Sequence, residues 1–176
     1  MARYVYSMER SDVERAMSLN CNALDLLQPK DPRRSNMLNT LATALFKLFD
    51  VSKELPHVDK AIELLREASA LLQCNRPLTL SNLSACLRVR FELSSQPMDL
   101  EEAISLNREA LDLLPNADEA RLHSVTTLCS PLLTRFAHLG QLSDVDDAVV
   151  LQREYLVLNC GQISDEQQAA SPVPPT

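Results

Sequence analysis

The side chains best suited to metal binding or acid–base catalysis are few in this chain of 176 residues, and they lie far apart. His57, His123 and His138 are the only histidines, and none belongs to an H-x-x-x-H or H-E-x-x-H motif. A zinc site on one helix needs two histidines about one turn apart, so no local zinc pair is expected. The sequence also contains no glycine-rich phosphate-binding motif. We therefore predict neither a metal nor a cofactor.

The five cysteines are widely spaced and include no C-x-x-C pair: Cys21, Cys74, Cys86, Cys129 and Cys160. Cys86 and Cys129 lie among apolar residues, which is typical of small buried side chains in a reducing compartment. A buried thiol is a poor nucleophile. A Cys–His pair assembled from distant segments remains an alternative, but nothing in the pattern favours it, and we predict that the chain is not an enzyme.

Two acidic runs resemble sets of metal ligands: Asp99, Glu101 and Glu102, and Asp144, Asp146 and Asp147. Each run stands where a helix is expected to begin, and the helix dipole favours negative charge in the first turn. We therefore predict that these carboxylates stabilise helix starts. Arg-Glu steps recur at 66–67, 108–109 and 153–154, and we expect a solvated face with weak ion pairs between repeats.

The overall charge argues against nucleic acid and anionic membranes as partners. The formal net charge is −7 and the isoelectric point is near 4.9, and the densest basic cluster, Lys30, Arg33 and Arg34, lies in a proline-containing loop. No apolar run is long enough to cross a bilayer, and the segment 1–10 lacks the apolar core of a secretory signal. We predict a cytoplasmic protein that binds neither nucleic acid nor membrane.

An amphipathic segment, MDLEEAISLNREALDLLP at 98–115, organises the chain. Its apolar residues follow the 3, 4, 7 spacing of a helix with one buried face. Related segments start at positions 11, 56 and 143, and all four copies share an alanine, which recurs at nearly constant intervals along the chain: Ala16, Ala61, Ala103 and Ala148. Periods of this length indicate a stacked-repeat protein.

We call the four segments that carry the repeat alanine back helices. A second helix type, the front helix, precedes three of them and lies at 35–49, 79–91 and 124–136. In each copy a leucine and a phenylalanine stand at the same two offsets before the repeat alanine: Leu41 and Phe49, Leu83 and Phe91, and Leu128 and Phe136. The sequence thus predicts a repeat domain over 1–160, with pairs at 33–72, 77–114 and 118–159 and a partial repeat at 1–27.

Three local features qualify this scheme. Tyr4 occupies the phenylalanine position of the first copy, so the chain is expected to begin with the tail of a front helix, as a fragment of a longer array would. Pro131 lies within a predicted helix, and we expect a kink or break near Ser130. The segment 161–176 is rich in Gln, Ser, Ala and Pro and is predicted to be a disordered tail.

The paired pattern resembles the tetratricopeptide repeat. The front helix is similar to the family's N-L-A/G-x-x-L segment at Asn82, Leu83, Ser84 and Leu87, and the back helix to its D-x-x-x-A-I-x-x-x-x-x-A-L segment at Asp99, Ala103, Ile104, Ala110 and Leu111, followed by Pro115. The resemblance implies an all-α, right-handed α–α superhelix, a solenoid of about three helix pairs plus the partial first repeat.

The chain departs from the common repeat in two ways. Its period is longer than that of the common tetratricopeptide repeat and resembles the long-period arrays of kinesin light chains and fungal proteins. The fungal arrays are often joined to a peptidase or NTPase domain, and this sequence contains neither. The repeat pattern of the family has a large apolar residue one helical turn after the repeat alanine. In this chain that position holds Asn20, Leu65, Asn107 and Gln152, so only one copy has the expected apolar residue. HEAT- or armadillo-like helices share a similar period and remain an alternative.

In the resembled family the front helices line a concave groove, and helical geometry places the corresponding residues opposite the apolar stripe. These predicted peptide-binding residues are Asn36, Asn39, Thr43, Lys47, Ser81, Arg88, His123, Thr126 and Ser130, with apolar neighbours Phe46, Leu78 and Leu133. We therefore expect a non-catalytic scaffold that binds a peptide or partner helix. The alternative is a structural spacer, or a fragment that self-associates as a homo-oligomer through uncapped ends.

Overall fold

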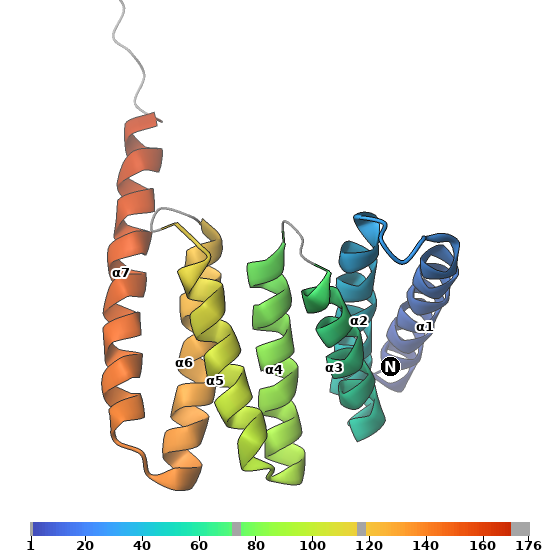
Figure 1. Cartoon of the computed structure of the whole chain (residues 1–176), viewed down its shortest axis with the longest axis horizontal. Helices are drawn as coiled ribbons and strands as arrows, with labels where there is room; N and C mark the ends of the chain where they lie inside the picture. Colours follow the sequence, from blue (N-terminus) through green and yellow to red (C-terminus); the bar gives the residue numbers. More distant parts are fainter. Residues whose placement is uncertain (1, 72–74, 116–118, 170–176) are drawn as a thin grey trace, which may run out of the picture.

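Seven α-helices follow one another in the computed structural model, which describes residues 2–71, 75–115 and 119–169 (Figure 1). The helices are α1 Ala2–Leu26, α2 Arg33–Ser52, α3 Leu55–Ala70, α4 Arg76–Ser94, α5 Pro97–Asp112, α6 Glu119–Leu139 and α7 Ser143–Ala169. The described residues contain no strand. The all-α prediction is therefore confirmed.

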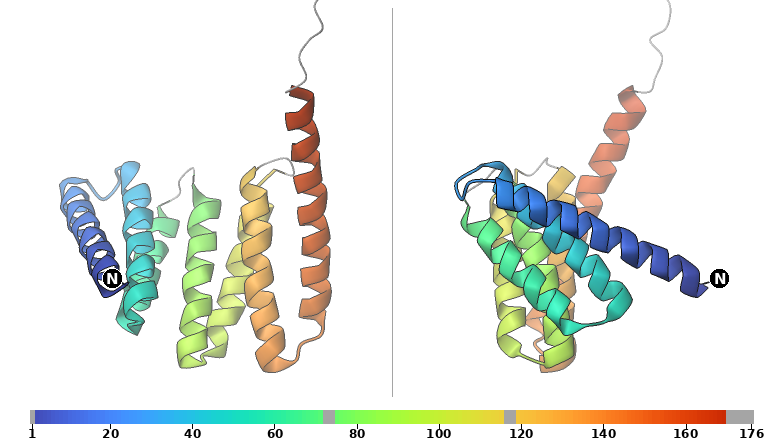
Figure 2. Two further views of the ribbon diagram at one scale, coloured as in Figure 1. Left: turned by 180° about the vertical axis from the view of Figure 1, so that it is seen from behind. Right: turned by 90° about the vertical axis from the view of Figure 1, so that its right-hand side faces the viewer.

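Each helix packs against the next, and the front helices α2, α4 and α6 also contact one another across the repeats. In the left view of Figure 2 these three helices stand side by side, whereas α3 and α5 lie on the far side. Ala61, Ala103 and Ala148 occupy the same place on α3, α5 and α7, where they are 0%, 0% and 3% exposed. The repeat alanine is small because the front helix passes closely over it. Ala16 on α1 is exposed.

Two apolar clusters form the core. The first joins α2, α3 and α4, and Met17 and Leu24 of α1 pack against it. The second joins α5, α6 and α7 through Ile104, Leu111, Val125, Leu128, Leu132 and Leu151. The back helices α3 and α5 thus bury their stripes between two front helices, as stacked repeats must if no single pair can hide its own apolar face.

The three front helices end in the same way. Each is followed by a residue with positive φ whose N–H donates to the carbonyl of the repeat phenylalanine, a common way to satisfy the last carbonyls of a helix. The pairs are Lys53 to Phe49 at 2.7 Å, Ser95 to Phe91 at 2.7 Å and Gly140 to Phe136 at 2.8 Å. Only the third copy has the glycine that this conformation favours.

One arginine at the start of each front helix joins three consecutive helices. Its guanidinium binds a glutamate of the following back helix and a carbonyl near the end of the preceding one. The ion pairs are Arg34 to Glu67 at 2.7 Å, Arg76 to Glu109 at 2.7 Å and Arg121 to Glu154 at 2.6 Å. These glutamates belong to the predicted Arg-Glu steps. Arg66 and Arg108 of the same steps form the expected pairs between repeats, with Glu102 and Asp147.

Two arginines of the front helices bind the acidic runs. Arg90 binds Asp99 through both carboxylate oxygens at 2.6 and 2.8 Å, and Arg135 binds Asp144 in the same way at 2.7 and 2.8 Å. Asp99 and Asp144 are 3% and 0% exposed, and the bidentate guanidinium compensates the charge of each buried carboxylate. Arg135 also reaches Glu101 of the preceding back helix at 2.6 Å.

The structure corrects three expectations about helix ends. The first is that α1 runs unbroken through Arg10 and Ser11, where the sequence predicts a turn between a front-helix tail and its partner. This stretch has no proline or glycine to end the helix, so the helical hydrogen bonds continue through it.

The other two corrections concern α6 and α7. The predicted break near Ser130 is wrong because α6 continues through Pro131. Helix α7 extends to Ala169, into the predicted disordered tail, because the first proline after its start is Pro172. Met1 and the remainder of the tail, 170–176, lie outside the described residues, as do the predicted repeat limits at 72 and 118.

Candidate functional site

The front helices carry the nine residues that the sequence predicts to bind a peptide. Six of them are exposed: Asn36, Thr43, Lys47, His123, Thr126 and Ser130. Arg88 is half-buried, and Asn39 and Ser81 are buried, at 8% and 1% exposure. The expected orientation toward solvent therefore does not hold for Asn39 and Ser81. Their repeat position faces the next front helix, and the equivalent Thr126 is exposed because α6 is the last front helix of the described chain.

A cavity of about 470 Å³, the front-face cavity, brings part of the predicted set together. Helix α2 contributes Thr43 and Lys47, and α4 contributes Leu78, which is 48% exposed. Helix α1 forms the opposite wall. The full lining is Asp12, Val13, Ala16, Asn20, Asn39, Thr40, Thr43, Ala44, Lys47, Leu78 and Asn82.

Amide groups join α2 to α4 at the floor of the front-face cavity. Asn39 Nδ2 donates to Thr79 Oγ1 at 2.5 Å, and Asn82 Nδ2 donates to Asn39 Oδ1 at 3.3 Å. Nearer the surface, Asn75 Nδ2 donates to Asn36 Oδ1 at 3.1 Å. Asn39 therefore orients its neighbours, while the half-buried Asn82 leaves its amide oxygen available to a ligand.

The two predicted basic groups of this face differ. Arg88 forms an ion pair with Glu92 one turn along α4, so its charge is already compensated. No carboxylate of the described residues lies within ion-pair distance of the exposed Lys47. Lys47 is thus the cation of the front-face cavity that can attract an acidic group.

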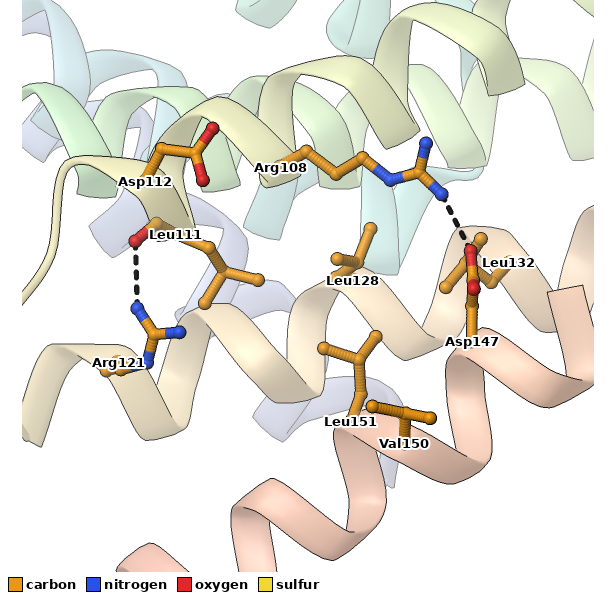
Figure 3. A pocket seen from close by; sticks show the side chains of 9 residues that line it. All are labelled: Arg108, Leu111, Asp112, Arg121, Leu128, Leu132, Asp147, Val150 and Leu151. Carbon is orange, nitrogen blue, oxygen red and sulfur yellow. Dashed lines mark hydrogen bonds and ion pairs between the residues drawn. The ribbon is translucent and has the colours of Figure 1, made fainter. Parts of the chain in front are cut away.

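A second hollow, the back cleft, lies between α5, α6 and α7 and measures about 410 Å³ (Figure 3). Leu128 and Leu132 of α6 form part of its apolar lining, with Leu111, Val150 and Leu151. Arg108 Nη2 bridges to Asp147 Oδ2 at 2.7 Å, and Arg121 Nη1 donates to the Leu111 carbonyl at 2.9 Å. Both guanidinium groups therefore hold repeats together.

The sequence did not predict the back cleft. The repeated Arg-Glu steps are the sequence feature that could have indicated it. Their position on a solvated face was predictable, but the sequence does not show which residues, 33 or 39 positions away, form ion pairs with them. Because its arginines are engaged within the chain, the cleft offers a ligand mainly apolar surface and the carboxylate of Asp112.

The cysteine thiols and histidine rings, the groups that could act as catalysts, lie in the following environments. Burial raises the pKa of the Cys86 thiol to about 12, and burial also raises that of Cys129, so neither is a thiolate at neutral pH. His57 Nδ1 lies 3.0 Å from Ser52 Oγ, and His138 packs edge-on against Phe91 at 5.0 Å. His123 is exposed on α6.

No group of three or more His, Cys, Asp or Glu side chains among the described residues is arranged to hold a metal ion. None of the described helices combines the length and apolar character that a bilayer-spanning segment requires.

Comparison with known proteins identifies structural but not sequence relatives. No family profile and no curated protein matches the chain. Two solved structures from Podosopora anserina are similar: a putative kinesin light chain with nearly identical TPR-like repeats, and its Q17M variant. Both are 16% identical to this chain, and the matches cover 81% of this chain and 68% of theirs, with TM-scores of 0.54 and 0.56. At this identity the likeness concerns the fold, and it confirms that the chain is a solenoid of tetratricopeptide-like helix pairs.

Proposed function

We propose that this chain is a non-catalytic interaction scaffold that binds a segment of a partner protein along its front helices. The observation that carries the proposal is the front-face cavity, where Thr43 and Lys47 stand beside the exposed apolar side chain of Leu78. Hollows that combine apolar lining with a few fixed polar groups are the usual form of binding sites. The solenoid fold supports the same role, since stacked repeats present extended binding surfaces.

The chemistry of the cavity favours a particular kind of segment. Leu78, Val13 and Ala44 can receive an apolar side chain, and the amide of Asn82 can bond to a peptide backbone. Lys47 favours an acidic residue of the ligand. Asp12 on the α1 wall disfavours a second one, so we expect a segment with a single acidic residue next to an apolar anchor.

Selection from a displayed library of random peptides tests this proposal. The wild-type chain should enrich segments with an acidic residue beside a large apolar one, and Lys47→Glu should lose their binding. The matched control is Lys60→Glu, an exposed lysine on the back helix α3, which should bind the same segments as the wild type. Segments that bind the Lys47→Glu and wild-type chains equally would refute the front-face assignment.

A second candidate, a spacer or self-associating fragment, is supported by the exposed apolar residues at both ends of the array. Leu19 on α1 is 64% exposed, and Val149 and Leu156 on α7 are 43% and 59% exposed. Static light scattering over a range of concentrations separates the two functions. A molecular mass that rises above that of one chain would favour self-association.

A further inference from the structure

A small hollow, which we call the inner pocket, adjoins the front-face cavity between α2 and α4. It measures about 110 Å³, and its lining is Ala42, Thr43, Phe46, Leu65, Asn82, Ala85 and Cys86. Thr43 and Asn82 also line the front-face cavity, so the two hollows are neighbours. Thr43 is exposed, whereas Leu65 and Cys86 are 1% and 3% exposed. The inner pocket thus has an apolar interior and polar side chains at its mouth.

The apolar interior is particular to the α2–α4 contact. At the α4–α6 contact the same repeat positions carry Ser84 in place of Ala42, Asn107 in place of Leu65, and Thr127 in place of Asn82. Asn107 Nδ2 donates to Ser84 Oγ at 2.6 Å, and Thr127 Oγ1 donates to Asn107 Oδ1 at 3.3 Å. The chain therefore uses that place for its own hydrogen bonds, whereas it leaves an apolar space between α2 and α4. The difference comes from the side chains, because both contacts join consecutive front helices.

The volume of the inner pocket limits what can enter it. An apolar cavity of roughly 150 Å³ holds one benzene ring, and the inner pocket, at about 110 Å³, is smaller. A valine, leucine or isoleucine side chain has fewer carbon atoms than that ring, whereas the aromatic side chains contain a complete ring and more. Water is a poor occupant, because only the mouth residues and the Cys86 thiol can bond to it. The chemistry therefore favours one branched aliphatic side chain.

The segment that the front-face cavity binds can supply this occupant. A backbone that crosses Thr43 and Asn82 can bond to the Asn82 amide and place one side chain in each hollow. Lys47 directly follows Phe46 on α2, and its ammonium has no carboxylate within ion-pair distance among the described residues. An acidic residue bound to Lys47 therefore brings its neighbour in the segment to the wall that Phe46 forms.

We propose, on the basis of the proposed function, that the inner pocket binds one branched aliphatic side chain of the partner segment and excludes aromatic ones. This side chain lies beside the acidic residue that pairs with Lys47. The apolar anchor that packs against Leu78 is a second side chain of the same segment. The inner pocket is thus the size-selective part of the site.

The experiment repeats the selection from a displayed library of random peptides with the whole chain and two variants of the inner pocket. The wild type should enrich valine, leucine or isoleucine at one position beside the acidic residue and deplete aromatic residues there. Ala85→Leu fills the pocket, so it should remove this preference while the acidic residue remains selected. Phe46→Ala enlarges the pocket, so it should admit phenylalanine or tryptophan at the same position.

Synthetic peptides with the enriched sequence measure the size of the effect by fluorescence anisotropy. Alanine in place of the aliphatic residue should weaken binding to the wild type about tenfold or more, because even one missing methylene in an apolar pocket has an effect of about this size. Tryptophan at that position should also weaken binding by about tenfold or more, and Phe46→Ala should restore most of that loss.

A matched control is Ala70→Leu, the same substitution at an exposed alanine at the end of α3, which should leave the selection unchanged. Circular dichroism should show an intact helical fold for every variant, and Phe46→Leu provides a milder enlargement if Phe46→Ala unfolds. Binding that depends on Lys47 but accepts aromatic and aliphatic residues equally would overturn this proposal and leave the front-face assignment intact. A size preference that Ala85→Leu does not alter would have the same meaning. If the wild type enriches no acidic segment, both proposals are overturned.

Discussion

Replacement of Asn107 on α5 should test whether its side chain compensates for the backbone hydrogen bond that Pro131 removes from α6. Asn107 is completely buried on α5, and its Nδ2 donates to Ser84 Oγ at 2.6 Å and to the Thr127 carbonyl at 3.0 Å. In a regular helix that carbonyl would accept from the N–H four residues later, but this residue is Pro131, which has no N–H. The asparagine of one helix therefore supplies the donor that the proline of another lacks.

The magnitude follows from these contacts. Asn107→Leu introduces the side chain that the previous repeat has at the same position, Leu65, which is 1% exposed. The new side chain removes the Asn107 donor from the half-buried Thr127 carbonyl, and a carbonyl that loses its donor away from water costs about 1–3 kcal/mol. Thr127 Oγ1 keeps a second acceptor, the Ser124 carbonyl at 3.0 Å. We therefore expect a loss of about 2 kcal/mol in the free energy of unfolding.

A double-mutant cycle separates this effect from a general loss of packing. Urea unfolding followed by circular dichroism would be measured for the wild type, Asn107→Leu, Pro131→Ala and the double variant. In the Pro131→Ala background the alanine N–H can bond to the Thr127 carbonyl within α6. The cost of Asn107→Leu should then fall by about 1 kcal/mol or more, at unchanged slope of the unfolding transition. An equal cost in both backgrounds would refute the proposed coupling.

Three further predictions concern charge and thiol chemistry. Arg135→Ala should lower the free energy of unfolding by about 3 kcal/mol in the same urea assay, because it leaves Asp144 buried and unpaired, whereas an exposed ion pair contributes less than about 1 kcal/mol. Hydrogen bonds from Arg33 lower the pKa of Asp31 to about 2, so its carboxylate should stay ionised until the pH falls to that value, and Arg33→Gln should raise the midpoint toward 3.8 in an NMR titration. Burial raises the pKa of Cys86 to about 12, so this thiol should react with a disulfide reagent at neutral pH only after unfolding.

The helix pairs could be predicted from the sequence because their signals are local and repeated. The spacing of apolar residues sets each amphipathic face, and the alanines mark where two helices approach closely, as the burial of Ala61 and Ala103 shows. Helix ends were less predictable. The repeat pattern places a boundary at Ser11, but no proline or glycine lies there to end the helix, and α1 continues through it.

The buried polar contacts could not be predicted because their partners are distant in the sequence. Asn107 departs from the apolar residue expected at its position, and from the sequence alone it weakens the match to the repeat. In the structure it is satisfied by two helices, one of which needs a donor because of Pro131. Both residues are exceptions to the pattern, and each explains the other. A pair of exceptions in neighbouring helices is therefore a signal that sequence analysis could use.

Comparison of the three complete repeats separates architecture from recognition. The arginine that joins three helices and the phenylalanine carbonyl that accepts from a positive-φ residue occur in every copy, so these positions hold the geometry of the array. At one front-face position, which lies at a fixed offset before the repeat leucine, the residue type differs in every copy: Asn36, Leu78 and His123. These three side chains share one face but differ in chemistry. If a partner segment binds there as proposed, it must present different side chains in a fixed order, and the order of the repeats would then determine its direction of binding.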